Sequence, residues 1–243
     1  MRAIFLSLLY FFICLKGIAQ EKINFFASDN LKITADLYLK DKSLPYIVLC
    51  HQANSSRGEY LEIASRLLKL NYNCLALDLR VGDNINYIKN ETAERAINNN
   101  IPHSFIDAKK DIEASLKYLK KYTHKPVILF GSSYSASLCL LIAKNNLNVK
   151  AVIAFSPGEY FRPELVVKDA ITGLNIPVFA SATAIEYDYV LQLLSGINEN
   201  LKTIYTPAAG KGLHGAKELW QTSETSDECW LQLLLFFQKF RTE

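Results

Sequence analysis

The stretch ILFGSSYSASLCLL, residues 128–141, places an apolar run directly before a glycine and a cluster of four serines. Together with the residue before it, the run VILF (127–130) predicts a buried strand, and the segment from about Tyr134 to Lys144 predicts a helix. Gly131 lies at the junction, where the chain must turn sharply from strand to helix. The fold depends on whether the rest of the chain repeats this strand-to-helix pattern.

Short apolar runs alternate with amphipathic segments along the whole chain. A hairpin is predicted first, because INFFA (23–27) and LKITADLYL (31–39) flank Asp29 and Asn30. Continuous apolar runs predict the later strands, at 46–51, 74–79, 127–130, 151–155, 177–182 and 201–206. Helical spacing of apolar residues predicts helices at 60–70, 105–122, 134–144 and 227–240, and residues 82–104 form a long polar stretch.

Buried strands that alternate with helices are typical of a mainly parallel sheet covered by helices on both faces. The predicted fold class is therefore α/β, with a twisted, mainly parallel sheet. The segment 156–176, between two of the predicted strands, is too short to hold a cap domain of any size. Because sites in such sheets form where strands end and helices begin, we expect an open site at this edge.

The first twenty residues, MRAIFLSLLYFFICLKGIAQ, resemble a secretory signal peptide. Arg2 precedes an apolar run from Ala3 to Leu15, and residues 17–19 (GIA) match a small-x-small cleavage site. We expect residues 1–19 to be removed, residues 20–243 to form one domain, and the mature protein to be periplasmic or extracellular. An uncleaved membrane anchor is the alternative, but the apolar run is shorter than the ~20 residues that a membrane span needs. Once residues 1–19 are removed, no stable membrane span is expected.

Composition argues against several other classes of protein. The formal net charge is +3 and the lysines are scattered, which argues against nucleic acid as the main partner. The chain has no CxxC pair, no HExxH motif and no His/Cys cluster, so neither a metal site nor a cofactor is predicted. Cys50, Cys74, Cys139 and Cys229 lie in or beside apolar segments without framework spacing, which predicts buried free thiols.

The size of the flanking residues distinguishes the serines of the quoted stretch. A nucleophile on a tight strand-to-helix turn needs small residues two positions before and after it. Ser133 has Gly131 and Ser135 at these positions, whereas both flanks of Ser132 are bulky aromatic residues. Ser135 also has small flanks, but it lies inside the predicted helix. Ser133 is therefore the candidate nucleophile.

A serine hydroxyl reacts only when a base takes its proton and a third group orients that base. His214 is the candidate base, because it lies in the glycine-rich segment GKGLHGAKELW (210–220) between the last strand and the last helix. The acid should follow the strand at 177–182, where Glu186 and Asp188 are both candidates. Glu186 is favoured because it lies four residues beyond Ala182, but the geometry of the loop leaves Asp188 open.

The order Ser133, Glu186, His214, with GSSYS (131–135) at the turn, resembles the α/β-hydrolase fold. Within that fold it is most similar to the dienelactone-hydrolase-like serine esterases. The segment LCHQANSSRGEYLEIASRLLKLNYNCLALDLR (49–80) resembles the oxyanion-loop strand, first helix and following strand of this family. The resemblance covers roughly residues 24–240.

The resemblance implies an enzyme, a serine hydrolase that cleaves an ester or similar acyl bond of a small molecule through an acyl-enzyme intermediate, without a cofactor. It implies an oxyanion hole made by the backbone N–H groups of Tyr134 and Ala53, with Gln52 adjacent and His51 shaping the loop. Gln52, where the family usually has glycine, and Tyr160 are candidate substrate-pocket residues. Two alternatives stay open: a non-catalytic binding protein on this scaffold, and a serine peptidase that uses the same three residues.

The N-terminus of the mature protein tests the export prediction. Mass spectrometry of the purified protein should find a chain that begins at Gln20, because the small-x-small site directs cleavage after Ala19. A soluble protein that still carries Met1 to Ala19 would contradict the prediction.

Overall fold

A computed structural model describes residues 19–239, which form one sheet of eight strands. The strand order is β1-β2-β4-β3-β5-β6-β7-β8, and only the pairs β1·β2 and β2·β4 are antiparallel. The predicted mainly parallel sheet is therefore confirmed. The strands are β1 (Ala19–Phe26), β2 (Lys32–Leu39), β3 (Tyr46–Cys50), β4 (Asn73–Leu77), β5 (Val127–Ser132), β6 (Val149–Phe155), β7 (Val178–Ser181) and β8 (Lys202–Tyr205).

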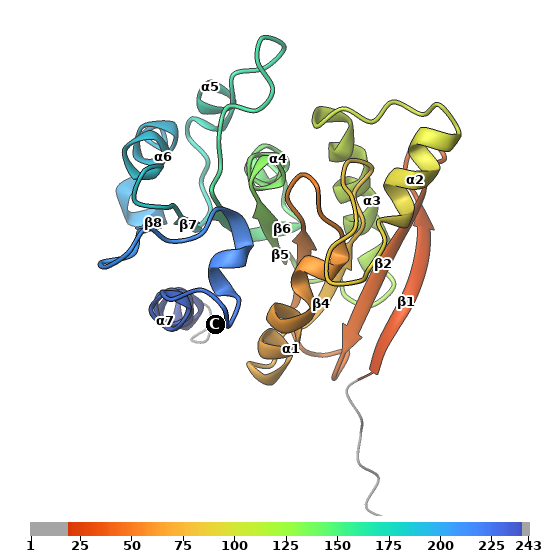
Figure 1. The fold of residues 1–243 in the computed structure, drawn as a ribbon, viewed down its shortest axis with the longest axis horizontal. Helices are drawn as coiled ribbons and strands as arrows, with labels where there is room; N and C mark the ends of the chain where they lie inside the picture. The colour runs from red at the N-terminus through yellow and green to blue at the C-terminus, as the bar shows by residue number, and fades with distance from the viewer. Residues whose placement is uncertain (1–18, 240–243) are drawn as a thin grey trace, which may run out of the picture.

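Helices cover both faces of this sheet, as predicted (Figure 1). Along β5, Leu129 points into the core under one set of helices, whereas Ile128 and Phe130 point into the core under the other. Every residue of β5 is buried, which explains why the central strands read as continuous apolar runs. One face carries α1 (Leu61–Lys69) and α7 (Ser226–Gln238), and the other carries α3 (Lys109–Leu119), α4 (Tyr134–Ala143), α5 (Val167–Ile171) and α6 (Tyr187–Leu193).

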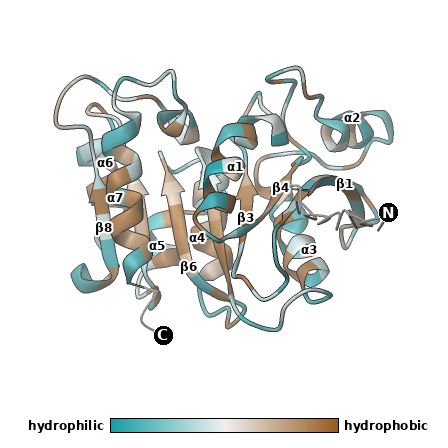
Figure 2. Cartoon of the chain, turned by 90° about the horizontal axis from the view of Figure 1, so that it is seen from below, coloured by the Kyte–Doolittle hydropathy of each residue, from teal (hydrophilic) through white to brown (hydrophobic). Residues whose placement is uncertain are grey.

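The distribution of hydropathy follows this layering. Figure 2 shows apolar strands at the centre and helices that carry both polar and apolar residues. Helix α4 is an exception, because nine of its residues are buried and only Leu141 is partly exposed. A helix buried on nearly all sides fixes the position of its first residues against the sheet.

Three helices form where the sequence pattern does not predict any. Helix α2 (Glu91–Asn98) lies inside the polar stretch 82–104, and α5 and α6 follow β6 and β7. The buried side of α2 consists of Thr92, Ala93 and Ala96, which are too small to produce an apolar periodicity. Its start is fixed instead by Asn90, whose side chain accepts a hydrogen bond from the N–H of Ala93 at 2.8 Å.

The carboxyl ends of the parallel strands carry no cap domain within residues 19–239, because the segment between β6 and β7 holds only loops and the five-residue helix α5. In the same part of the chain no helix is long and apolar enough to cross a membrane, and no group of acidic, His and Cys residues is placed to hold a metal ion. Its four cysteines are free and buried. The predicted signal peptide, apart from Ala19, lies outside the described residues.

Two buried arginines tie the loops after β3 and β4 to the rest of the fold. Arg80 Nη2 lies 2.7 Å from Asp111 Oδ1, and its Nη1 lies 2.7 Å from Asp29 Oδ2. Arg57 Nη1 lies 2.5 Å from Asp78 Oδ2. The side chains of Arg80, Asp111 and Asp78 are fully buried, so these charges depend on one another for stabilisation.

We expect the substitution Arg80→Met to lower the free energy of unfolding by about 3–5 kcal/mol, because it leaves Asp111 buried without its counter-charge. The control is Lys109→Met, which removes one end of an exposed ion pair with Glu113 and should cost less than about 1 kcal/mol. Urea denaturation of the two variants measures the difference. Equal costs would contradict the structural role of Arg80.

Candidate active site

Ser133 lies on a strained turn between β5 and α4. Its backbone has φ 59° and ψ −126°, a conformation that L-residues seldom adopt. Hydrogen bonds hold the turn: Ser133 N donates to Phe155 O at 2.7 Å, and Ser132 N donates to Ser135 Oγ at 2.9 Å. Ser135 Oγ in turn donates to Cys50 O at 2.7 Å, so the turn is also attached to the end of β3.

Gly131 is required because the strand and the helix approach closely at this turn. A Cβ atom at Gly131 would lie 2.5 Å from both the N and the Cα of Ala136 and from the carbonyl oxygen of Ser135. Such contacts involve backbone atoms that have no room to move. The small residue two positions before Ser133 therefore has a direct steric reason.

The structure brings Ser133, Glu186 and His214 together. His214 Nε2 lies 2.9 Å from Ser133 Oγ, and His214 Nδ1 lies 2.5 Å from Glu186 Oε1. The three residues follow β5, β7 and β8, whose carboxyl ends meet at one edge of the sheet. Asp188, the other candidate acid, is exposed in the first turn of α6, and His214 is hydrogen-bonded to Glu186 instead.

Glu186 is held as a carboxylate by its hydrogen bonds. Oε2 accepts one from Ser156 Oγ at 2.8 Å and one from Thr183 N at 3.1 Å, while Oε1 faces His214. Burial acts to raise the pKa of Glu186, but the bonds from His214, Thr183 and Ser156 outweigh it and lower the pKa to about 2. An ionised carboxylate in this position fixes the orientation and the tautomer of the imidazole.

Ser156 is a site residue that the sequence analysis misses. Its hydroxyl donates to Glu186 and accepts a hydrogen bond from Gly215 N at 3.0 Å, so it links the loop of the acid to the loop of the base. Its φ of 51° turns the chain sharply away from β6. The one signal in the sequence is its place directly after a predicted buried strand, which it shares with many serines that have no such role.

The loop after β3 lies beside the turn of Ser133 and carries the second expected oxyanion donor. Tyr134 is the first residue of α4, so its N–H has no partner within the helix. Between residues 19 and 239, neither this N–H nor that of Ala53 is bonded to a backbone or side-chain acceptor. The neighbouring Gln52 N, by contrast, donates to the buried Glu59 Oε2 at 3.1 Å.

His51 and Gln52 shape this loop from inside. His51 Nε2 accepts from Leu79 N at 3.0 Å, so the proton is on Nδ1, which lies 2.7 Å from Gln52 O. Burial lowers the pKa of His51 to about 4, which keeps the ring neutral. The Gln52 side chain packs against Gly215, where a Cβ atom would lie 2.5 Å from Gln52 Oε1.

Tyr160, a candidate pocket residue, lies next to the Ser133 hydroxyl. Its Oη is 3.2 Å from Ser133 Oγ and 3.1 Å from Ser156 O. The adjacent Phe161 is buried in the core under α4 and α5. The two aromatic residues of the segment SPGEYF thus have different surroundings, and only Tyr160 reaches Ser133.

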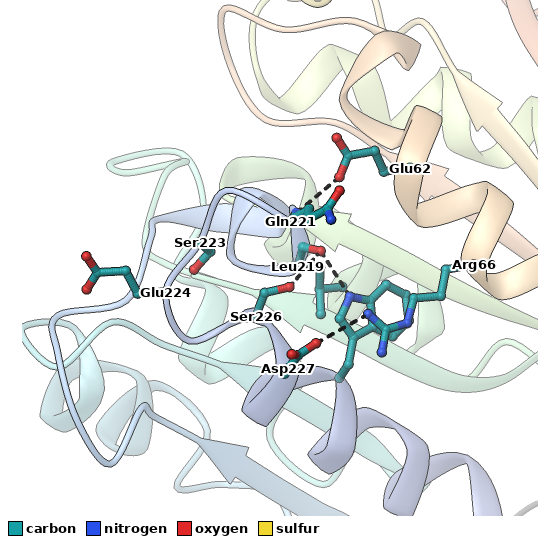
Figure 3. Close-up of a pocket in the computed structure, with 9 residues that line it drawn as sticks. Glu62, Arg66, Leu219, Gln221, Ser223, Glu224, Ser226 and Asp227 are labelled. Atoms are coloured by element: carbon teal, nitrogen blue, oxygen red, sulfur yellow. Dashed lines mark hydrogen bonds and ion pairs between the residues drawn. The ribbon is translucent and has the colours of Figure 1, made fainter.

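A separate cavity of about 420 Å³ lies between α1 and the chain around the start of α7 (Figure 3). Arg66 lies over the ring of Trp230, 4.4 Å from its centroid, and pairs with Asp227 at 3.8 Å. Neither Ser133 nor His214 lines this cavity. It is lined by Glu62, Arg66, Leu219, Gln221, Ser223, Glu224, Ser226, Asp227 and Trp230.

Comparison with known proteins finds similarity in structure alone. No family model matches the chain, and no curated protein matches it. An esterase from Pyrococcus furiosus superposes with a TM-score of 0.67 at 17% identity, over 91% of this chain and 93% of that one. A dienelactone hydrolase from Anabaena variabilis has a TM-score of 0.67 at 15% identity, over 91% and 97% of the two chains. An α/β-hydrolase from a Penicillium species has a TM-score of 0.67 at 13% identity, over 91% of this chain and 98% of that one. At such identities the similarity shows a shared fold.

Proposed function

From the α/β-hydrolase fold that this chain has, we propose that it is a serine hydrolase that cleaves an ester or similar acyl bond of a small molecule. The observation that carries the proposal is the continuous contact from Ser133 Oγ to His214 at 2.9 Å and from His214 to Glu186 at 2.5 Å. A base within hydrogen-bonding reach, oriented by an ionised acid, is what a serine hydroxyl needs to become a nucleophile.

The proposed reaction has two steps. Ser133 Oγ attacks the carbonyl carbon while His214 Nε2 takes its proton, and the N–H groups of Tyr134 and Ala53 bind the oxyanion, each donor contributing about 3 kcal/mol. His214 then gives the proton to the leaving alcohol, which leaves an acyl group on Ser133. Water attacks this acyl-enzyme with His214 as the base, and the acid product leaves. Glu186 holds the Nδ1–H of His214 and stabilises its cation throughout.

We further propose that the mature protein acts outside the cytoplasm. The support is the signal-like N-terminal sequence, with its apolar run and the GIA cleavage pattern at residues 17–19.

Ser133 and His214 lie at an edge of the sheet that no cap domain covers within residues 19–239, and the His214 side chain is 45% exposed. A substrate therefore approaches the three residues directly from solvent.

A fluorophosphonate probe tests the nucleophile. We expect it to label Ser133 in the folded protein, and Ser133→Ala to abolish labelling and lower turnover of p-nitrophenyl acetate by about 10³-fold or more while the thermal stability is kept. Ser195→Ala, at an exposed serine, is the control and should change neither.

Two other results would count against an esterase. A folded wild-type protein that takes no label would favour the non-catalytic binding protein. Faster cleavage of amide probes than of the matched ester probes would favour the peptidase.

The two candidate acids are separated by a matched pair of variants. Glu186→Gln removes the charge beside His214 Nδ1 and should lower kcat by about 10³ to 10⁴-fold, whereas Asp188→Asn should stay within about twofold of the wild type. A large loss in Asp188→Asn with little change in Glu186→Gln would reverse the assignment.

The pH dependence follows from the lowered pKa of Glu186. Because this pKa is about 2, against 4.5 for an ordinary glutamate, the carboxylate stays charged and Glu186 should add no inflection of its own to the acid side of the kcat/KM profile. The stabilising contribution of the Glu186 carboxylate is complete above pH 4.5 and is lost as the pH falls towards 2. Two acid inflections in the kcat/KM profile would contradict this expectation.

A further inference from the structure

Five polar residues form a closed ring of hydrogen bonds around the candidate active site, and Ser156 takes part through both its carbonyl oxygen and its hydroxyl. Ser133 Oγ contacts both His214 Nε2 at 2.9 Å and Tyr160 Oη at 3.2 Å. Tyr160 Oη donates to Ser156 O at 3.1 Å, and Ser156 Oγ donates to Glu186, which bonds back to His214. Of these members, Ser156 and Tyr160 take no part in the two-step reaction, and Ser156 is occupied by its bonds to Glu186 and Gly215.

The Ser133 hydroxyl has one proton and two neighbours that compete for it. In this structure Ser133 Oγ donates to Tyr160 Oη at 3.2 Å. When the Ser133 proton points to His214 Nε2 instead, or is replaced by an acyl group, the lone pairs of Ser133 Oγ are open to a donor, and the Tyr160 hydroxyl lies at the same distance. The Tyr160 hydroxyl donates to Ser156 O at 3.1 Å, and Ser133 Oγ, at 3.2 Å, becomes a second acceptor once its own proton no longer points to Tyr160. Rotation about the C–O bond of the phenol is enough to move it from one to the other.

The position of the Tyr160 ring is fixed by its own loop. The ring lies against Gly158, where a Cβ atom would come within 2.9 Å of Tyr160 Cε2. Gly158 is anchored to α4 through its N and O, which bond to Ser137 Oγ at 2.8 and 2.7 Å. On the other side Phe161 is buried in the core. Burial raises the pKa of Tyr160, so the phenol keeps its proton at neutral pH and remains a donor.

We propose that Tyr160 is a catalytic residue that donates a hydrogen bond to Ser133 Oγ when this oxygen leaves the acyl group. This inference rests on the proposed hydrolase function. In the second step the bond between the carbonyl carbon and Ser133 Oγ breaks, the electron pair stays on the oxygen, and the proton comes from His214 Nε2. The Tyr160 O–H keeps its proton and stabilises the negative charge that develops on Ser133 Oγ before that transfer is complete.

The role predicts an asymmetric effect on the two steps. A donor to Ser133 Oγ helps that oxygen as a leaving group but does not help it as a nucleophile, because it draws electron density from the attacking atom. The loss of one hydrogen bond to a developing charge should slow deacylation about 10- to 100-fold. Acylation should stay within about threefold of the wild type or become faster.

The test is Tyr160→Phe, followed in the pre-steady state with p-nitrophenyl acetate. We expect a burst of one p-nitrophenol per active site at a near wild-type rate, then a steady-state rate lowered 10- to 100-fold, with an acetyl group on Ser133 in the intact mass. KM should fall together with kcat. The control is Tyr189→Phe, which removes a hydroxyl of α6 that accepts a hydrogen bond at 2.6 Å from the N–H of Glu159, the residue before Tyr160. It should change neither phase by more than about threefold.

The outcomes separate the two proposals. A wild-type protein that neither reacts with the probe nor releases p-nitrophenol would overturn both the hydrolase function and the role of Tyr160. If the wild type is active but Tyr160→Phe slows the burst and the steady state equally, only the role of Tyr160 is overturned. Unchanged deacylation in Tyr160→Phe would overturn it as well. If Tyr189→Phe slows the burst and the steady state as much as Tyr160→Phe does, the effect comes from the loop, and the role of Tyr160 is also overturned.

Discussion

The sharp turn from β5 into α4 is the constraint on which the rest of the site depends. The backbone of Ser133 is held at φ 59°, which costs free energy that the turn alone does not recover. This cost is offset by the packing of the buried helix α4 and by the hydrogen bonds of Ser133 N and Ser135 Oγ to neighbouring strands. This works only because Gly131 lets the helix begin against the strand without a side chain between them.

Parallel strands explain why residues so far apart in sequence meet. The loops that carry Ala53, Ser133, Ser156, Glu186 and His214 follow β3, β5, β6, β7 and β8, five neighbouring strands that all end at the same edge. Hydrogen bonds between side chains and backbone then join each loop to the next. The buried ion pairs of Arg57 and Arg80 hold the loops after β3 and β4 in place, so the residues at this edge are attached to a rigid scaffold.

Two histidines at this edge show how environment separates structure from chemistry. His51 is completely buried, its pKa is lowered to about 4, and both ring nitrogens face backbone groups. His214 is partly exposed, with a carboxylate on one nitrogen and a hydroxyl on the other. The first ring holds a loop in place, whereas the second has the partners that proton transfer requires.

The sequence by itself determined what is local. Uninterrupted apolar runs predict strands buried on both faces, and the small flanks of Ser133 together with its place between strand and helix single it out, because periodicity and side-chain size act on neighbouring residues. The tertiary structure decided that His214 faces Glu186 and not Asp188, that Ser156 and Tyr160 join the same ring, and that α2 forms inside a polar stretch. These depend on the paths of separate loops and on small buried side chains, and a one-dimensional pattern does not contain that geometry.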